Sequence, residues 1–291
     1  MSVPSSGPAL AGLRPPESAG ESGFTPRAFT MAYSPAAGWH KPQLLPIEQL
    51  ALHPGAAGLH NGQIVIEGLK AYRRIDSTIA AFRPWEHARR LRDSARRAAM
   101  PALPADLFVS AVEELVEADA GSLDDAPGSS LYLRSLMFAA DLSLGRGPAR
   151  RHGFVLMAQS DHPGARSASD QLDGANLFAV RATRPRAEVT LLEPEDEVLR
   201  GVMAESVLTL ASRLGYIVRQ QRVTREQWRR DPGHGASEVF RCGAEEGIAA
   251  IGDDAPGPVT AAITHALSDI QSGREPGPRG WMYQLPSAEL S

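Results

Sequence analysis

Short strand-like segments alternate with longer helical segments along this chain, and that alternation limits its fold more than any other feature. Nine segments are rich in β-branched or aromatic residues and are bounded by turn-forming residues, a pattern that predicts β-strands. They cover residues 28–33, 62–68, 78–82, 130–138, 153–159, 176–182, 187–192, 216–223 and 237–242.

Four helical segments lie between and after these strands. The segment 84–100 begins with a proline at a first-turn position, and the segment 105–119 places its apolar residues on one stripe. The segments 201–215 and 257–273 each end at a glycine, which we expect in the left-handed conformation that closes a helix. Strands mixed with helices over two stretches predict an α+β or α/β protein of two lobes with a crevice between them.

Composition excludes several classes of function. Hydrophobic residues make up 43% of the chain and charged residues 22%, as in an ordinary globular protein. A net charge of −4 predicts binding neither to nucleic acid nor to an anionic membrane surface. No apolar run has membrane-spanning length, and the first 23 residues lack the pattern of a signal peptide. The single cysteine, Cys242, excludes an intramolecular disulfide and suits the cytoplasm, which is the predicted location.

Changes of composition suggest four parts. Residues 1–23 are rich in Pro, Gly and Ser and are predicted to form a disordered tail. Residues 24–159 are predicted to form an N-terminal small lobe, and residues 176–291 a C-terminal lobe. Residues 160–175, SDHPGARSASDQLDGA, are the one interior stretch with the composition of a loose linker, so they mark the predicted boundary.

Lysine is scarce, and this limits the chemistry of the chain. Lys41 and Lys70 are the only lysines among 30 lysine and arginine residues. A lysine amine forms the Schiff base in one large class of covalent catalysis. Lys70 lies in EGLKAYRR (67–74), and the 221 residues that follow it contain no other.

Nine segments carry motifs that occur together in one protein family. They are GWHKPQLLP (38–46), LALHPGAAGLH (50–60), EGLKAYRR (67–74), FRPWEHARR (82–90), SLYLR (130–134), NLF (176–178), LGYIVRQQRVTREQW (214–228), EVFRCG (238–243) and the tail at 253–285. In this order they resemble the branched-chain amino acid aminotransferases of fold type IV, which use pyridoxal 5'-phosphate (PLP). The resemblance covers nearly all of residues 24–285.

This resemblance implies a two-lobed fold-type-IV subunit, usually dimeric, that binds PLP between its lobes. It implies that Arg90 stands where the family holds the PLP phosphate, a role that suits the guanidinium fork. It also places Tyr132 and Arg134 of SLYLR on the substrate side, where they would help to hold a carboxylate. We therefore expect a small-molecule substrate and a homodimer.

The lysine that the family needs has no counterpart here. PLP transamination uses a lysine that forms a Schiff base and then shuttles a proton, and the family carries it in the second lobe. This chain runs from GFVLMAQ (153–159) directly into residues 160–175, so on the order of fifty residues are missing at ordinary lengths of strand, helix and loop. The second lobe is therefore predicted to be truncated by an internal deletion. Lys70 is expected to be exposed at the end of its strand and to carry no PLP.

Other positions also depart from the family pattern. Gln171 or Asp170 stands where the family has a glutamate facing the pyridine nitrogen. The GT of the family's phosphate-binding turn reads Gly243-Ala244 here, and two acids follow it. Negative charge is unfavourable beside a phosphate. The site at Arg90 is therefore expected to be a relic, with no cofactor bound.

Four polar residues are candidates for acid–base chemistry: Asn61, His60, Glu245 and Asp173. His60 and Asn61 border the substrate cavity that the resemblance implies, although a core histidine is the commoner case. Glu245 could form a carboxylate pair with Glu246, in which like charge raises one pKa, but we favour a solvated loop. Asp173 precedes a glycine at an ordinary turn position. No metal-ligand spacing is present, so no metal is expected.

These departures predict a protein that no longer uses PLP. The main hypothesis is a PLP-independent enzyme on the aminotransferase scaffold, of isomerase, cyclase or lyase type, acting on an anionic molecule in natural-product metabolism. The alternative is a non-catalytic pseudoenzyme that serves as a ligand-binding or regulatory subunit of an active homologue. A third hypothesis is a decaying gene with an internal deletion.

Overall fold

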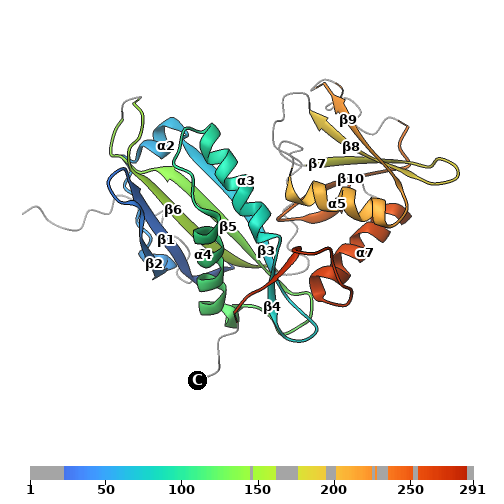
Figure 1. The fold of residues 1–291 in the computed structure, drawn as a ribbon, viewed down its shortest axis with the longest axis horizontal. Helices are drawn as coiled ribbons and strands as arrows, with labels where there is room; N and C mark the ends of the chain where they lie inside the picture. The colour runs from blue at the N-terminus through green and yellow to red at the C-terminus, as the bar shows by residue number, and fades with distance from the viewer. Residues whose placement is uncertain are drawn as a thin grey trace, which may run out of the picture.

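Two β-sheets with helices packed on them make up the computed structural model of this chain (Figure 1). It describes residues 23–144, 147–161, 176–194, 201–224, 227, 235–251 and 255–286. The first sheet has seven strands in the order β12-β4-β3-β5-β6-β1-β2, and the second has five in the order β11-β10-β7-β8-β9. This mixture confirms the predicted α+β class.

The first sheet is antiparallel throughout. Its strands are β1 (Phe24–Ser34), β2 (Gly38–Pro46), β3 (Ile64–Arg73), β4 (Ile79–Phe82), β5 (Ser130–Ala139), β6 (His152–Asp161) and β12 (Met282–Gln284). In β5 the buried residues Leu131 and Leu133 alternate with the half-exposed Tyr132 and Arg134, as the two-residue period of a strand requires. Both polar side chains therefore lie on the face of β5 opposite the leucines.

Two helices, α3 (Pro84–Arg97) and α4 (Ala105–Ala118), cover one face of this sheet (Figure 1). Each presents an apolar stripe to the strands, and the core between them includes Phe29, Leu91 and Leu115. Shorter elements at its rim are η2 (Ile47–Gln49), α2 (Ala57–Asn61) and η3 (Ala120–Ser122). Strand β4 pairs with β3 only over residues 71–73 of β3.

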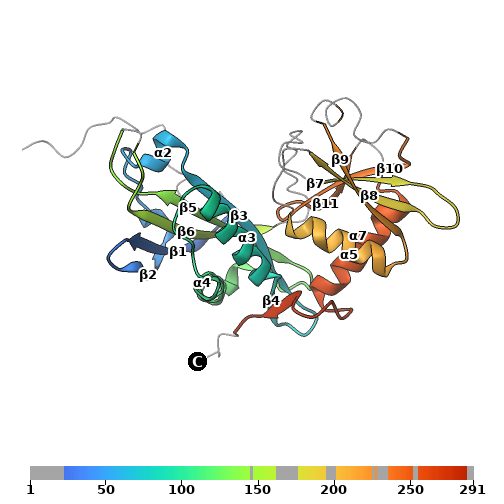
Figure 2. The same cartoon turned by 45° about the horizontal axis from the view of Figure 1, so that its top comes forward.

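The second sheet is built from β7 (Asn176–Arg181), β8 (Glu188–Pro194), β9 (Ile217–Val223), β10 (Glu238–Gly243) and β11 (Gly247–Ala250). Strands β8 and β9 are parallel, and helix α5 (Val202–Arg213) lies between them in the sequence. With α7 (Pro258–Ser272), α5 packs against this sheet (Figures 1 and 2). The rings of Phe178 and Phe240 stack at 4.9 Å in its core.

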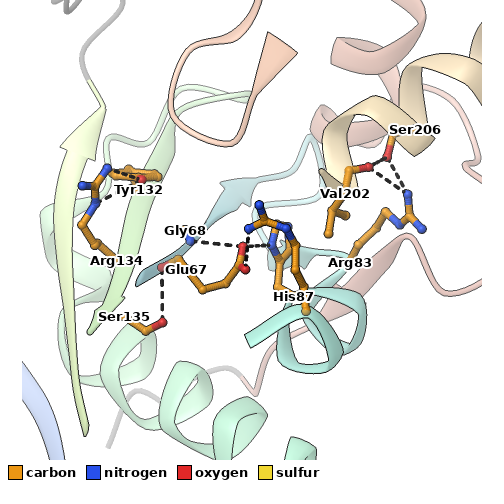
Figure 3. A network of polar contacts seen from close by, with 10 residues as sticks. Glu67, Gly68, Arg83, His87, Tyr132, Arg134, Ser135, Val202 and Ser206 are labelled. Carbon is orange, nitrogen blue, oxygen red and sulfur yellow. Dashed lines mark hydrogen bonds and ion pairs between the residues drawn. The ribbon is translucent and has the colours of Figure 1, made fainter. Parts of the chain in front are cut away.

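Contacts around Arg83 tie the two sheets together. Arg83 Nη1 donates to the carbonyl of Val202 at 3.1 Å and to Ser206 Oγ at 2.8 Å, both on α5 (Figure 3). Its guanidinium also lies 5.3 Å from the ring centroid of Trp281. After α7 the chain returns to the first sheet, where β12 pairs with β4 (Figure 2). Arg83, just before α3, and the segment 281–284 after α7 thus fix the two sheets relative to each other.

All nine predicted strands and all four predicted helices are confirmed, with ends shifted by a few residues. Sequence reasoning missed β2, β11, β12 and α2 as elements. Strand β2 contains two prolines and a lysine, and the others are three to five residues long, too short for a periodic pattern. Gly215 and Gly273 adopt positive φ angles of 84° and 82°, as expected for residues that close a helix.

The predicted tail and linker fall almost wholly outside the described residues, so the domain boundaries stay predictions. None of the described helices is long and apolar enough to span a membrane. Among the same residues no cluster of His, Cys, Asp or Glu has the geometry to hold a metal ion.

Candidate functional site

A cavity of about 340 Å³ lies where the two sheets meet. The first sheet and α3 contribute Ile66, Glu67, Gly68, Tyr132 and Arg134, with His87 and Arg90. The second sheet and the start of α5 contribute Asn176, residues 201–203, Arg241 and the turn at 243–246. Four of the predicted site residues, Arg90, Tyr132, Arg134 and Glu245, therefore meet in one cavity.

The buried carboxylate of Glu67 holds two side chains of α3. Its Oε1 lies 2.9 Å from His87 Nδ1, and its Oε2 accepts from Arg90 Nη1 at 2.7 Å (Figure 3). Burial alone raises the pKa of Glu67, which is 3% exposed, but hydrogen bonds and charge from His87 and Arg90 outweigh it. The net pKa lies below its ordinary value, so Glu67 is ionised and fixes Arg90 at the cavity wall.

Tyr132 and Arg134 form a second polar group on the opposite face of the sheet. The Tyr132 hydroxyl accepts from Arg134 Nη2 at 2.7 Å and from Nε at 3.2 Å (Figure 3). It fits because Gly68 has no side chain, since a Cβ there would overlap the hydroxyl oxygen. Burial raises the pKa of Tyr132, so the hydroxyl stays protonated.

The turn between β10 and β11 brings an acid to the same arginine. Glu245 Oε2 accepts from Arg134 Nη2 at 2.8 Å, and both side chains are about half exposed. The neighbouring Glu246 folds over Gly243, where a Cβ would lie 2.6 Å from its Oε2. Residues 244–246 form a turn after the strand, and there Glu245 lines the cavity and makes an ion pair.

Two features of the cavity suit a phosphate. Arg90 Nε is buried without a hydrogen-bond partner among the described residues, although Nη1 is held by Glu67. Helix α5 begins at Val202, and its N-cap Gly201 lines the cavity together with Val202 and Met203, so the N-terminal end of the helix lies at the wall. A guanidinium and a helix start in one cavity are a common pair of ligands for a phosphate.

No amine reaches this cavity from either lysine. Lys70 Nζ donates to Asp161 Oδ2 at 2.5 Å, and Ser130 Oγ donates to the same oxygen at 2.8 Å. The prediction that Lys70 is exposed at a strand end is wrong, because it lies inside β3 and is only 9% exposed. Lys41 is an exposed residue of β2. The cavity therefore fits the phosphate of PLP but offers no lysine to its aldehyde.

The remaining predicted residues lie elsewhere. His60 is exposed on α2, 2.8 Å from the carbonyl of Pro54, and neither it nor Asn61 lines the cavity. Asp173, with Gln171 and Asp170, falls outside the described residues. Sequence reasoning missed Glu67 and His87. An acid within an apolar strand and a histidine three residues before Arg90 on one helix face were the signals available.

Comparison with known proteins finds relatives that share one name, branched-chain-amino-acid aminotransferase. No known protein-family profile matches the chain. It is 31% identical to a probable branched-chain-amino-acid aminotransferase of Streptomyces coelicolor, over 90% of this chain and 91% of that protein. It is 28% identical to the branched-chain-amino-acid aminotransferase of Mycolicibacterium smegmatis, with 90% of each covered. The alignment with the first spans 333 positions, against 291 residues in this chain, so that relative has residues without a counterpart here.

Solved structures share the fold. The Escherichia coli branched-chain amino acid aminotransferase matches with a TM-score of 0.70 at 21% identity, covering 90% of this chain and 100% of that one. The T.th. branched-chain amino acid aminotransferase complexed with N-(5'-phosphopyridoxyl)-L-glutamate matches with a TM-score of 0.69 at 22% identity, covering 90% and 99%. The predicted fold-type-IV architecture is confirmed.

The prediction of a PLP-independent isomerase, cyclase, lyase or regulatory pseudoenzyme is contradicted by these relatives, which are named as aminotransferases. So is the expectation of no cofactor, since related structures carry phosphopyridoxyl-glutamate or pyridoxamine 5'-phosphate. The prediction gave more weight to the missing lysine than to Arg90, Tyr132 and Arg134, which all line one cavity. With 31% identity to a relative over 90% of its length, the chain belongs to the branched-chain amino acid aminotransferase family.

Proposed function

We propose that this protein binds PLP in the cavity between its sheets and transfers amino groups between branched-chain amino acids and 2-oxo acids. The observation that carries the proposal is the meeting of Arg90, Tyr132 and Arg134 in one cavity of a chain from this family. Bound PLP would supply the electron sink for the reaction, and the protein would supply binding and orientation.

The chain's own residues divide the work between two ends of the cavity. Arg90, held by Glu67, and the first turn of α5 would bind the phosphate. Arg134, held by the Tyr132 hydroxyl, would bind the carboxylate of the amino acid. Ile66 lies half-exposed at the wall and offers apolar surface to a branched side chain.

We also propose that this is a divergent member that holds its cofactor without a covalent bond, so that water would carry the proton that the family's lysine shuttles. Three observations support this: Lys70 is bound to Asp161, Lys41 lies on β2, and the relative's alignment is longer than this chain. The segment that would carry the family's lysine is then the missing one. The homodimer and the cytoplasmic location stay predictions.

Calorimetric titration of the purified protein with PLP tests the function directly. We expect binding that weakens about tenfold to a hundredfold in Arg90→Gln, because a charge-assisted hydrogen bond contributes roughly 1.5–3 kcal/mol. Arg90→Lys keeps the charge, so its affinity for PLP should lie between those of wild type and Arg90→Gln. The matched control is Arg89→Gln, since Arg89 pairs with Glu86 on the same helix and does not line the cavity.

Two further measurements complete the test. After borohydride reduction, mass spectrometry should find no PLP attached to the chain, and PLP fixed to Lys70 or Lys41 would refute non-covalent binding. Amino transfer from leucine to 2-oxoglutarate should require added PLP. A protein that binds no PLP, or that turns over no substrate with PLP bound, would overturn the proposed function.

A further inference from the structure

We infer that Glu245 is a specificity-determining residue that occupies the carboxylate-binding position on Arg134 until a ligand carboxylate displaces it. The ligand class, a monocarboxylic amino acid or 2-oxo acid, rests on the proposed function. The contact itself is present in the structure.

The geometry puts the acid and a ligand in competition for one group. Arg134 Nη2 donates both to the Tyr132 hydroxyl at 2.7 Å and to Glu245 Oε2 at 2.8 Å. A guanidinium recognises a carboxylate through parallel N–H bonds from its fork. A ligand carboxylate bound in this way would need the same Nη2 group, so Glu245 would have to leave.

Displacement of Glu245 costs little. Its side chain is 48% exposed and that of Arg134 is 43% exposed, so both charges keep much of their hydration. Ion pairs of this kind contribute about 0.2–1 kcal/mol. Glu245 also sits in the short turn 244–246, which belongs to neither strand and is followed by Gly247 with a positive φ of 72°. Glu245 therefore lowers carboxylate affinity without closing the cavity.

The next residue provides a matched control. Glu246 carries the same charge and lines the same cavity, but its carboxylate lies over Gly243 and no bond joins it to Arg134. Removing either acid makes the cavity less negative by one charge. Only removal of Glu245 frees Arg134.

The test measures binding of 4-methylvalerate and of its uncharged amide by calorimetry, without added PLP. Against wild type, Glu245→Gln should bind the carboxylate about twofold to fivefold more tightly, as the worth of an exposed ion pair implies. Glu245→Asp, whose shorter side chain cannot span the same distance, should also bind it more tightly. Glu246→Gln should gain less than either, and the amide should bind all four proteins equally.

Three outcomes would overturn the inference: an unchanged or weaker affinity in Glu245→Gln, equal gains in Glu245→Gln and Glu246→Gln, or no carboxylate binding to any variant. A loss of packing at the turn would lower affinity, so the sign of the effect separates the inferred role from a structural one. Because no cofactor is added, a protein that binds no PLP can still pass this test, and one that binds PLP can still fail it.

Discussion

The two walls of the cavity differ in how firmly their charges are held. On the first wall, Glu67 is 3% exposed and is satisfied by His87 and Arg90. On the second wall, Glu245 is 48% exposed and makes one ion pair with Arg134. Both are carboxylates that hold an arginine, yet only the first is sealed from water.

This difference explains which family features the chain retains. Arg90 cannot change without leaving the Glu67 carboxylate buried and underpaired, so the proposed phosphate anchor also stabilises the first sheet. The turn at 243–247 has no such constraint, and there Ala244 and two acids stand where the resemblance implies a Gly-Thr pair. Stability of the fold therefore accounts for Arg90 as well as the proposed phosphate binding does.

The largest effect should come from Glu67→Gln, which keeps the volume but removes the buried charge. We expect a loss of about 3 kcal/mol of unfolding free energy, because the two hydrogen bonds that His87 and Arg90 make to a buried, charged carboxylate are weakened together. Urea denaturation followed by circular dichroism measures it. A loss below about 1 kcal/mol would mean that the first wall is no more constrained than the second.

Low pH should remove the difference in stability between wild type and Glu67→Gln. The pKa of Glu67 is lowered by folding, so its contribution is fully present above the pKa of the unfolded chain, which lies near 4.5. It is lost as the pH falls through the folded value. The gap in stability between wild type and Glu67→Gln should therefore be constant from pH 7 to 5 and narrow below about 4.5. A gap that persists in acid would show that the carboxylate charge is not its cause.

A smaller effect should distinguish two glycines, one on each wall. A Cβ at Gly68 would overlap the Tyr132 hydroxyl, which is held within the sheet, whereas a Cβ at Gly243 meets only the flexible end of Glu246. We expect Gly68→Ala to cost about 2 kcal/mol by overpacking, and Gly243→Ala to stay within about 0.5 kcal/mol. Thermal unfolding of both variants checks this, and equal costs would contradict it.

Much of the fold followed from the sequence because strand and helix patterns are local. The buried and half-exposed positions of β5 repeat every two residues, and the helix ends carry proline or glycine. Strand β12 could not be found in this way, because a three-residue strand is defined only by its partner β4 across the chain. The environment of Lys70 was missed for the same reason, since Asp161 lies ninety-one residues away.

The site was only partly predictable. Arg90, Tyr132 and Arg134 came from a family resemblance, and the structure brings them together. The pairing of Glu245 with Arg134 could not be read from the sequence, because it depends on how the β10–β11 turn approaches β5. The cofactor prediction failed because absence of one residue type says nothing about how many other contacts to a ligand survive.

The smallest effect should come from Glu245→Gln, measured as stability and not as binding. Its ion pair is half exposed on both sides, so the variant should lose less than about 1 kcal/mol. High salt should distinguish Glu245→Gln from Glu67→Gln more clearly, because in 1 M NaCl the Debye length falls to about 3 Å and exposed charges are screened. The stability gap between wild type and Glu245→Gln should then vanish, while the gap for Glu67→Gln should remain because the Glu67 carboxylate and His87 are buried. If both gaps shrink alike in urea titrations at 0.1 M and 1 M NaCl, Glu67 is no better protected than Glu245 and the contrast between the walls fails.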